Sequence, residues 1–298
     1  MIYSNLTKRI LAFLVCSFVF LFPFVACDFA YAAEIKYIDK ILNRGYLKVG
    51  LPPYTTPPFY FNESNGELAG YDVQIIKNFA KFLDIDVQFD RDSTSFNDLV
   101  RRSGANDFDM AIGKLGTTYA RMSDAHPHEY MNFRHSILAK RKSIANLQGN
   151  IPDSDFARVL LNSNIKLGFI GRSAYDTYAN SLFPNAEKIG YKDWDKCKEA
   201  LFAGEVDGIY RDATEVKKIV YQEPSLSLDY VPVLFDDIVD QKSIYLSTEA
   251  DTDMASILDY FLSKQVTIKD DSEIIAEFPE FYKPNTDIST KKTKKGAS

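Results

Sequence analysis

Two short runs of the chain combine charged side chains with strand-to-helix turns, a combination that suits the binding of a small charged molecule. Residues 109–121 (DMAIGKLGTTYAR) predict a buried strand, a loop of small residues and the start of a helix that carries Arg121. Such a loop brings backbone N–H groups, hydroxyls and a guanidinium together, and these groups hold a carboxylate. Residues 204–212 (GEVDGIYRD) predict a second strand, which ends in Asp212. A basic site and an acidic site on separate α/β units would form a clamp for a zwitterion.

The sequence around these runs predicts alternating helices and strands. In the first half of the chain, apolar residues recur at helical spacing between short apolar strands. A second series follows Arg134, with strands expected at residues 135–140, 166–170, 207–210 and 243–246 and an extended segment at 228–234 that crosses back. The alternation predicts an α/β fold of two units, each with a mainly parallel sheet flanked by helices.

The two units share a local pattern. Each has an aspartate at the start of an apolar strand, a few residues after a glycine: Asp109 follows Gly104, and Asp207 follows Gly204. The likeness is too weak for a tandem repeat, and it indicates two units of similar construction.

Composition excludes some classes of protein. The chain has 35 basic and 41 acidic residues, a formal net charge of −6, and without residues 1–33 the net charge is −7. This acidic balance argues against nucleic-acid binding, because such proteins present a basic field. Of the three cysteines, only Cys197 lies well beyond the N-terminal segment, so no disulfide within the mature chain is expected.

The first 33 residues predict an export signal and a periplasmic protein. Two basic residues precede an apolar stretch, and the small-x-small run AYA at residues 30–32 predicts cleavage after it. A retained membrane anchor is one alternative, and lipid attachment at Cys27, which follows the lipobox-like FVA, is another. Residues 286–298 are rich in lysine and predict a disordered basic tail.

Five blocks, in order, resemble the extracellular solute-binding proteins of family 3, which serve polar amino-acid ABC importers. The blocks are residues 44–50 (RGYLKVG), 58–59 (PF), 66–73 (GELAGYDV), 109–121 and 200–212 (ALFAGEVDGIYRD). Each block alone is weak, but their order is specific, and the resemblance covers about residues 40–265.

The resemblance implies a two-lobed periplasmic-binding-protein-like fold of type II, with the ligand in a cleft between the lobes. By analogy, lobe 1 comprises residues 34–134 and 236–285, and lobe 2 comprises residues 135–235. Two crossing segments join the lobes, which close on the ligand by a hinge motion.

The resemblance also implies which residues hold the ligand. Arg121 matches the arginine that pairs with the ligand α-carboxylate, because a planar guanidinium can make two parallel hydrogen bonds to it. Asp212 matches the acid that receives the α-ammonium group. Alternatively, Asp212 and Glu215 form only a capping box for the helix that follows.

Three further residues match pocket positions. Phe96 matches an apolar wall, with a core phenylalanine as the alternative. Ser173 matches a hydroxyl position at a helix start in lobe 2, with a plain N-cap as the alternative. Thr118 is expected to cap the helix that carries Arg121 and to support the pocket.

Three departures from the family pattern bear on the choice of ligand. Gly116 stands where Ser or Thr is usual, so one hydroxyl is missing, although its backbone N–H remains a donor. Lys114 and Arg172 stand where small residues are usual, and together with Arg211 they add positive charge to the matched cleft. We therefore expect Lys114, Gly116 and Arg211 to line the ligand site and an acidic ligand to be favoured. Alternatively, the two arginines face solvent or pair with neighbouring acids.

The sequence predicts no catalytic set, no metal and no cofactor. His126, His128 and His135 lack the compact spacing of a metal site, because a proline separates the first two. Cys197 has no histidine near it in sequence and is expected to be a buried thiol.

The resemblance therefore implies a protein that binds a small amino acid or related carboxylate and delivers it to an ABC-type importer. Its expected partners are the solute and a membrane permease, and we expect a monomer. Two alternatives remain: an enzyme on the same fold, similar to the cyclohexadienyl dehydratases, and a ligand-sensing module. No Ser-His-Asp set or paired acid and base is visible, which favours a binding protein over an enzyme.

Overall fold

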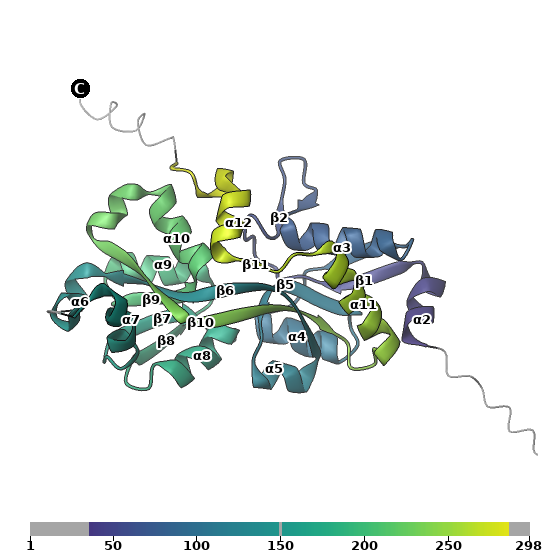
Figure 1. Cartoon of the computed structure of the whole chain (residues 1–298), viewed down its shortest axis with the longest axis horizontal. Helices are drawn as coiled ribbons and strands as arrows, with labels where there is room; N and C mark the ends of the chain where they lie inside the picture. The colour runs from purple at the N-terminus through teal and green to yellow at the C-terminus, as the bar shows by residue number, and fades with distance from the viewer. Residues whose placement is uncertain (1–35, 149–150, 286–298) are drawn as a thin grey trace, which may run out of the picture. The chain divides into compact units, whose positions relative to one another are not determined.

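A nine-stranded mixed sheet runs through the part of the chain that the computed structural model describes, residues 36–148 and 151–285 (Figure 1). At one end, β4 (Asp86–Asp90), β1 (Tyr46–Gly50) and β5 (Met110–Gly116) are parallel. At the other end, β8 (Glu187–Tyr191), β7 (Lys166–Ile170) and β9 (Gly208–Asp212) are parallel as well. The structure thus has the two parallel α/β units that the sequence predicts. The predicted signal (1–33) and basic tail (286–298) lie outside the described residues.

Two long antiparallel strands join the parallel sets in the middle of the sheet. They are β6 (His126–Lys140) and β10 (Tyr230–Leu246), which pair from Tyr230–Lys140 to Leu246–His126. β10 also pairs with β5, and β6 pairs with β9 and with the short strand β11 (Lys269–Asp270). Because each long strand hydrogen-bonds to one parallel set, the sheet continues without a break from one unit to the other.

The sequence underestimates these two strands. Residues 135–140 and 228–234 were expected as short crossings and 243–246 as a separate strand, whereas 243–246 is the last part of β10. The intervening residues 235–242 (FDDIVDQK) are too polar to give a strand signal. Their backbone nevertheless pairs with β6, with a register shift between Phe235 and Val239.

The strands alternate with helices, as the sequence predicts. At several of them the residue before the first turn caps it; Ser95, Thr118, Ser173, Asp193 and Asp251 each accept a hydrogen bond from the backbone of their own helix. The elements not yet named are α2 (Tyr37–Arg44), β2 (Phe61–Asn62), β3 (Leu68–Ala69), α3 (Tyr71–Phe82), α4 (Phe96–Gly104), α5 (Tyr119–Asp124), α6 (Arg141–Gln148), α7 (Asp153–Leu161), α8 (Ala174–Leu182), α9 (Trp194–Ala203), α10 (Ala213–Gln222), α11 (Thr252–Gln265), α12 (Asp271–Glu277) and two 3-10 helices, Pro224–Leu228 and Pro279–Tyr282.

Helices pack on the sheet and enclose its apolar side chains. α3 and α4 both contact β5, and Figure 1 shows helices on both sides of the strands. Phe79 of α3 and Phe261 of α11 are buried and their rings lie 5.0 Å apart. Cys197 is buried and free, as predicted, and burial raises the pKa of its thiol to about 12. In the described residues, no helix has the length and apolar character needed to cross a membrane.

The structure explains the aspartate that starts one strand in each unit. The Asp109 carboxylate accepts a hydrogen bond from the Lys48 N–H at 2.7 Å, and the Asp109 N–H donates to the Lys48 carbonyl at 2.9 Å. Asp207 makes the same two bonds with Lys166, both at 2.8 Å. Each aspartate therefore ties its strand to the neighbouring parallel strand, β5 to β1 and β9 to β7.

These two aspartates form a matched pair for a stability test. Asp109 is buried and also pairs with Arg44 and accepts from the Tyr37 hydroxyl at 3.1 Å, whereas Asp207 is half-buried. Because Asp109→Ala strands more donors, we expect it to lower the free energy of unfolding by about 2–3 kcal/mol, against about 1 kcal/mol for Asp207→Ala. Urea unfolding of each variant measures the difference. Equal losses would show that the additional partners of Asp109 contribute nothing.

Candidate ligand-binding site

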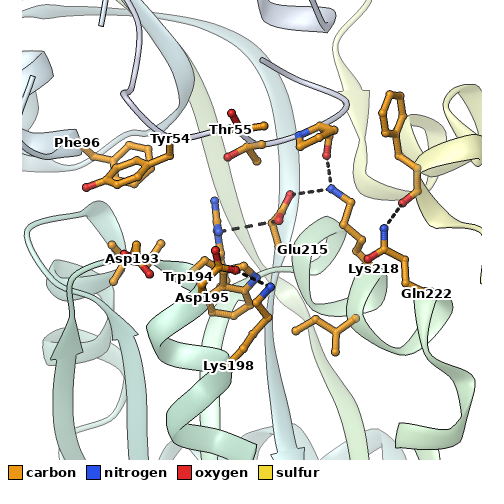
Figure 2. A pocket seen from close by; sticks show the side chains of 16 residues that line it. Tyr54, Thr55, Phe96, Asp193, Trp194, Asp195, Lys198, Glu215, Lys218 and Gln222 are labelled. Carbon is orange, nitrogen blue, oxygen red and sulfur yellow. Dashed lines mark hydrogen bonds and ion pairs between the residues drawn. The ribbon is translucent and has the colours of Figure 1, made fainter. Parts of the chain in front are cut away.

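Two adjoining cavities lie between segments of the two units. The outer cavity has a volume of about 420 Å³, which is enough for a small organic acid. Figure 2 shows Tyr54, Thr55 and Phe96 on one side of it and residues of α9 and α10 on the other. The inner cavity measures about 20 Å³, room for little more than one water-sized group. Both cavities are lined by Phe96, Ile170 and Arg211, so the inner one is the deep end of the same cleft.

The lining of the inner cavity carries more positive than negative charge. Its basic side chains are Lys114, Arg121, Arg211 and Lys242, and its acidic side chain is Asp212. All five side chains are buried. Together with Glu215 and Asp240, the buried acids that form ion pairs with these side chains, the acids number three against four bases. A further buried acid, Asp72, accepts from the Lys114 backbone N–H, and burial raises its pKa to about 7.

Asp212 is both a helix cap and the centre of a buried ion cluster. Its Oδ1 accepts from the Glu215 N–H at 3.4 Å, so Asp212 is the N-cap of α10. The same oxygen lies 3.0 Å from the Lys114 Nζ, while the Nζ of Lys242 and the Nε of Arg211 lie 3.9 Å from Oδ2. Burial alone would raise the pKa of Asp212, but the neighbouring cations, Lys114 foremost, hold it well below its usual range. Asp212 is therefore an anion in the folded protein.

Lys114 reaches from β5 to the start of α10. Its Nζ lies 2.9 Å from the Thr214 hydroxyl and 3.3 Å from the Glu215 Oε1, in addition to Asp212. The ammonium also lies 4.2 Å from the centre of the Phe59 ring, a cation–π contact. Lys114 has a left-handed backbone, with φ 52°, and its N–H donates to Asp72 at 3.0 Å. The side chain thus connects the two units through the cleft.

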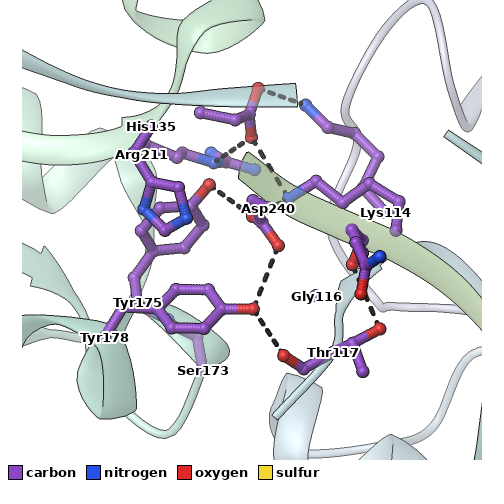
Figure 3. A network of polar contacts seen from close by, with 12 residues as sticks. Lys114, Gly116, Thr117, His135, Ser173, Tyr175, Tyr178, Arg211 and Asp240 are labelled. Carbon is purple, nitrogen blue, oxygen red and sulfur yellow. Dashed lines mark hydrogen bonds and ion pairs between the residues drawn. The ribbon is translucent and has the colours of Figure 1, made fainter. Parts of the chain in front are cut away.

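A second ion pair closes the back of the cleft. Lys242 pairs with Asp240, which also accepts from the Tyr175 hydroxyl at 2.6 Å and the Tyr178 hydroxyl at 3.1 Å (Figure 3). Burial lowers the pKa of Lys242, an effect that Asp240 opposes. Gly116 is packed against this network: a Cβ there would lie 2.6 Å from the Asp240 Oδ1. The absence of a side chain at Gly116 therefore lets the network approach the strand.

Arg121 differs from the other buried cations because its partners are neutral. Its guanidinium donates to the Asn97 Oδ1 through Nε at 3.0 Å and Nη2 at 2.9 Å, and to the Gly116 carbonyl through Nη1 at 2.8 Å. Among the described residues, no carboxylate lies within ion-pair distance of it. Burial lowers the pKa of Arg121. The side chain is thus a buried charge that still has N–H groups available.

The remaining predicted site residues fall into two groups. Phe96 lines both cavities and its ring lies 5.5 Å from that of Tyr54, so it is a cleft residue as expected. Thr118 and Ser173 are N-caps, accepting from Arg121 at 3.3 Å and Tyr175 at 3.2 Å, although Ser173 also lines the inner cavity.

The two arginines of the charge argument differ. Arg211 is buried, stacks 5.1 Å from the Trp194 ring and lies 3.9 Å from Glu215. Arg172 is exposed, and its backbone N–H donates to Asp176 at 3.2 Å.

Sequence reasoning missed Lys242, Asp240 and Asn97. Lys242 and Asp240 lie in the polar middle of β10, where no motif singles them out. Asn97 follows Phe96 in the first turn of α4 and resembles any exposed helix residue in sequence. The described residues include no group of three or more His, Cys, Asp or Glu that could hold a metal ion.

Comparisons with known proteins place this site in context. The sequence profile of the bacterial extracellular solute-binding proteins, family 3, matches residues 47–274. An arginine-binding periplasmic protein of Mannheimia haemolytica is 25% identical over 174 residues, which span 57% of this chain and 65% of that relative. The chain thus matches slightly less than two thirds of that relative's length.

Solved structures share the fold. An ancestral amino acid-binding protein, AncCDT-1, described as a precursor of cyclohexadienyl dehydratase, superimposes with a TM-score of 0.62 at 18% identity and covers 83% of this chain and 99% of its own. Arginine-bound ArgBP from T. maritima gives 0.61 at 21% identity over 76% and 99%. A lysine complex of a putative ABC transporter binding component from Wolinella succinogenes gives 0.62 at 20% identity over 80% and 94%. These matches confirm the predicted two-lobed, type II periplasmic-binding-protein fold, and the chain belongs to the bacterial extracellular solute-binding proteins of family 3.

Proposed function

We propose that this protein binds a small solute bearing a carboxylate, such as an acidic amino acid or a related acid, in the cleft between its lobes and delivers it to an ABC-type importer. The observation that carries this proposal is the environment of Arg121. Its buried guanidinium hydrogen-bonds only neutral groups and lacks a carboxylate partner among the described residues. A buried charge without a counterion is costly, and a bound carboxylate would remove that cost through charge-assisted bonds.

The surrounding charge supports an acidic solute over a basic one. A ligand in the deep end of the cleft would meet four basic side chains and one acid, and that acid is already paired with Lys114. The similar proteins named for arginine and the lysine complex carry cationic ligands. A cationic side chain in this cleft would add to an existing excess of positive charge, which in a low-dielectric site is strongly unfavourable.

The remaining parts of the proposal concern the chain as a whole. Residues 1–33 direct export to the periplasm, with lipid attachment at Cys27 as the alternative. Lobe 1 comprises residues 34–134 and 236–285, lobe 2 comprises residues 135–235, and the protein acts as a monomer with a membrane permease. The register shift of β10 between Phe235 and Val239 supports a hinge at this boundary, because an interrupted ladder bends more readily.

Binding of an acidic solute can be measured directly. We expect glutamate, aspartate or a dicarboxylate to bind the purified mature protein more tightly than arginine or lysine, because the cleft has an excess of buried positive charge. Calorimetry gives the affinities, and fluorescence of Trp194, the single tryptophan, which lines the outer cavity, reports binding independently. Tighter binding of arginine or lysine than of any acid would overturn the choice of ligand class.

Mass spectrometry should recover the solute unchanged, and its conversion to a product would favour an enzyme.

A substitution can test whether the planar guanidinium of Arg121, rather than its positive charge alone, binds the solute. Arg121→Lys keeps the charge but loses the planar fork, so we expect affinity for the acidic solute to fall about tenfold to a hundredfold. Arg172→Lys is the control, since Arg172 is exposed and should leave the affinity unchanged. Thermal unfolding shows whether each variant remains folded. Equal affinity in both variants would remove Arg121 from the site.

A further inference from the structure

We infer that the Lys114 ammonium occupies the place that the amine of an amino acid would take, so that the cleft selects carboxylic acids without an α-amine. The class comprises oxo acids, hydroxy acids and plain dicarboxylic acids. The inference rests on the proposed function, because it specifies the solute that the same cleft would hold.

The first support is that the protein's own cations already surround Asp212, the acid that lines the inner cavity. Its Oδ1 lies 3.0 Å from the Lys114 Nζ and accepts from the Glu215 N–H and from the Thr214 hydroxyl. Its Oδ2 faces Lys242 and Arg211, each at 3.9 Å. These two contacts to Oδ2 are too long for hydrogen bonds, but an ammonium placed at Oδ2 would lie beside two like charges, which disfavours a ligand amine there.

The second support is that the neighbouring acids are also engaged. Glu215 lies 3.3 Å from the Lys114 Nζ, 3.8 Å from the Lys218 Nζ and 3.9 Å from the Arg211 Nη1. Asp240 pairs with Lys242 and accepts from two tyrosine hydroxyls. In the deep end of the cleft, a ligand amine would therefore have to compete with the protein's own cations for these carboxylates.

The third support is that Lys114 is held firmly enough to resist displacement. Its ammonium has three oxygen partners, Asp212, Thr214 and Glu215, and the Phe59 ring lies 4.2 Å away. Only 3% of its side chain is exposed. Expelling this ammonium from the cluster would leave a buried cation without partners, which is costly. A carboxylate of a ligand, in contrast, would displace no group of the protein, because Arg121 has no carboxylate partner among the described residues.

Matched pairs of solutes test the inference on the wild-type protein. The probes are L-glutamate against 2-oxoglutarate and glutarate, L-aspartate against succinate, and L-phenylalanine against phenylpyruvate. In the pair that binds, we expect the acid without the amine to bind at least about tenfold more tightly by calorimetry. Tighter binding of the amino acid overturns this inference but leaves the proposed function standing. Failure of every acid to bind overturns the proposed function itself.

Two variants of Lys114 supply the second test. Lys114→Gly removes the ammonium and its chain, and glycine suits the left-handed backbone there, so we expect the preference to reverse toward the amino acid. Lys114→Met removes the charge but keeps the volume, so it should weaken acid binding without admitting the amine. Arg211 and Lys242 remain near Asp212 in both variants, and thermal unfolding checks that both are folded. The inference is wrong if Lys114→Gly keeps the wild-type preference. It is also wrong if Lys114→Met binds the amino acid as tightly as Lys114→Gly does, because Lys114 would then not occupy the place of a ligand amine.

Discussion

The ion pair between Lys114 and Asp212 is the interaction on which the cleft depends. It joins the last strand of one parallel set to the first turn of α10, with 3% and 2% of the two side chains exposed. Charges buried to this degree need several partners, because the free-energy cost of removing two ions from water can exceed the attraction between them alone. In this cluster each lysine pairs with two acids: Lys114 with Asp212 and Glu215, and Lys242 with Asp240 and Asp212. The charges around the cleft are thus arranged as one network, and a change in one member alters the others.

The backbone around this network is shaped to let it form. Lys114 adopts a left-handed conformation, and at Gly116 a side chain would collide with Asp240, Tyr178 and Ala174. Gly116 therefore leaves room for a neighbouring strand and helix to come close, and Lys114 supplies a positive charge two residues before it. In this way the protein fills space and charge positions near the loop with its own atoms.

Local rules predicted most elements, and long-range geometry explains what they missed. β7 lies where its apolar residues place it, at 166–170, and four of its five residues are buried. The middle of β10 has no such signal, since pairing with β6 rather than apolar character makes it a strand. The same division holds in the cleft. Arg121 and Asp212 stand out in recognisable blocks, and the sequence also indicates that Asp212 could cap α10.

The partner of Lys114, in contrast, could not be predicted from the sequence. Lys114 and Asp212 are 98 residues apart, and their contact exists because two separate units face each other across the cleft. The sequence indicated that positive charge gathers near the site, but it could not tell a free cation from a neutralised one. Arg172 proved exposed, and Arg211 lies over Trp194 beside two acids. Arg121 also lines the inner cavity, and its hydrogen-bond partners among the described residues are neutral.

Ligand choice within this fold therefore depends on a few charges rather than on the architecture. The solved structures that share the fold include arginine and lysine complexes, and their backbones superimpose on this one at about 20% identity. A fold of this kind fixes where a cleft lies, and the side chains at the ends of its strands decide what the cleft holds. In this chain one such side chain is an ammonium that already neutralises the nearest acid. We therefore expect the charge of the solute to be set by the guanidinium of Arg121, which lacks a carboxylate partner among the described residues and which an anion would neutralise.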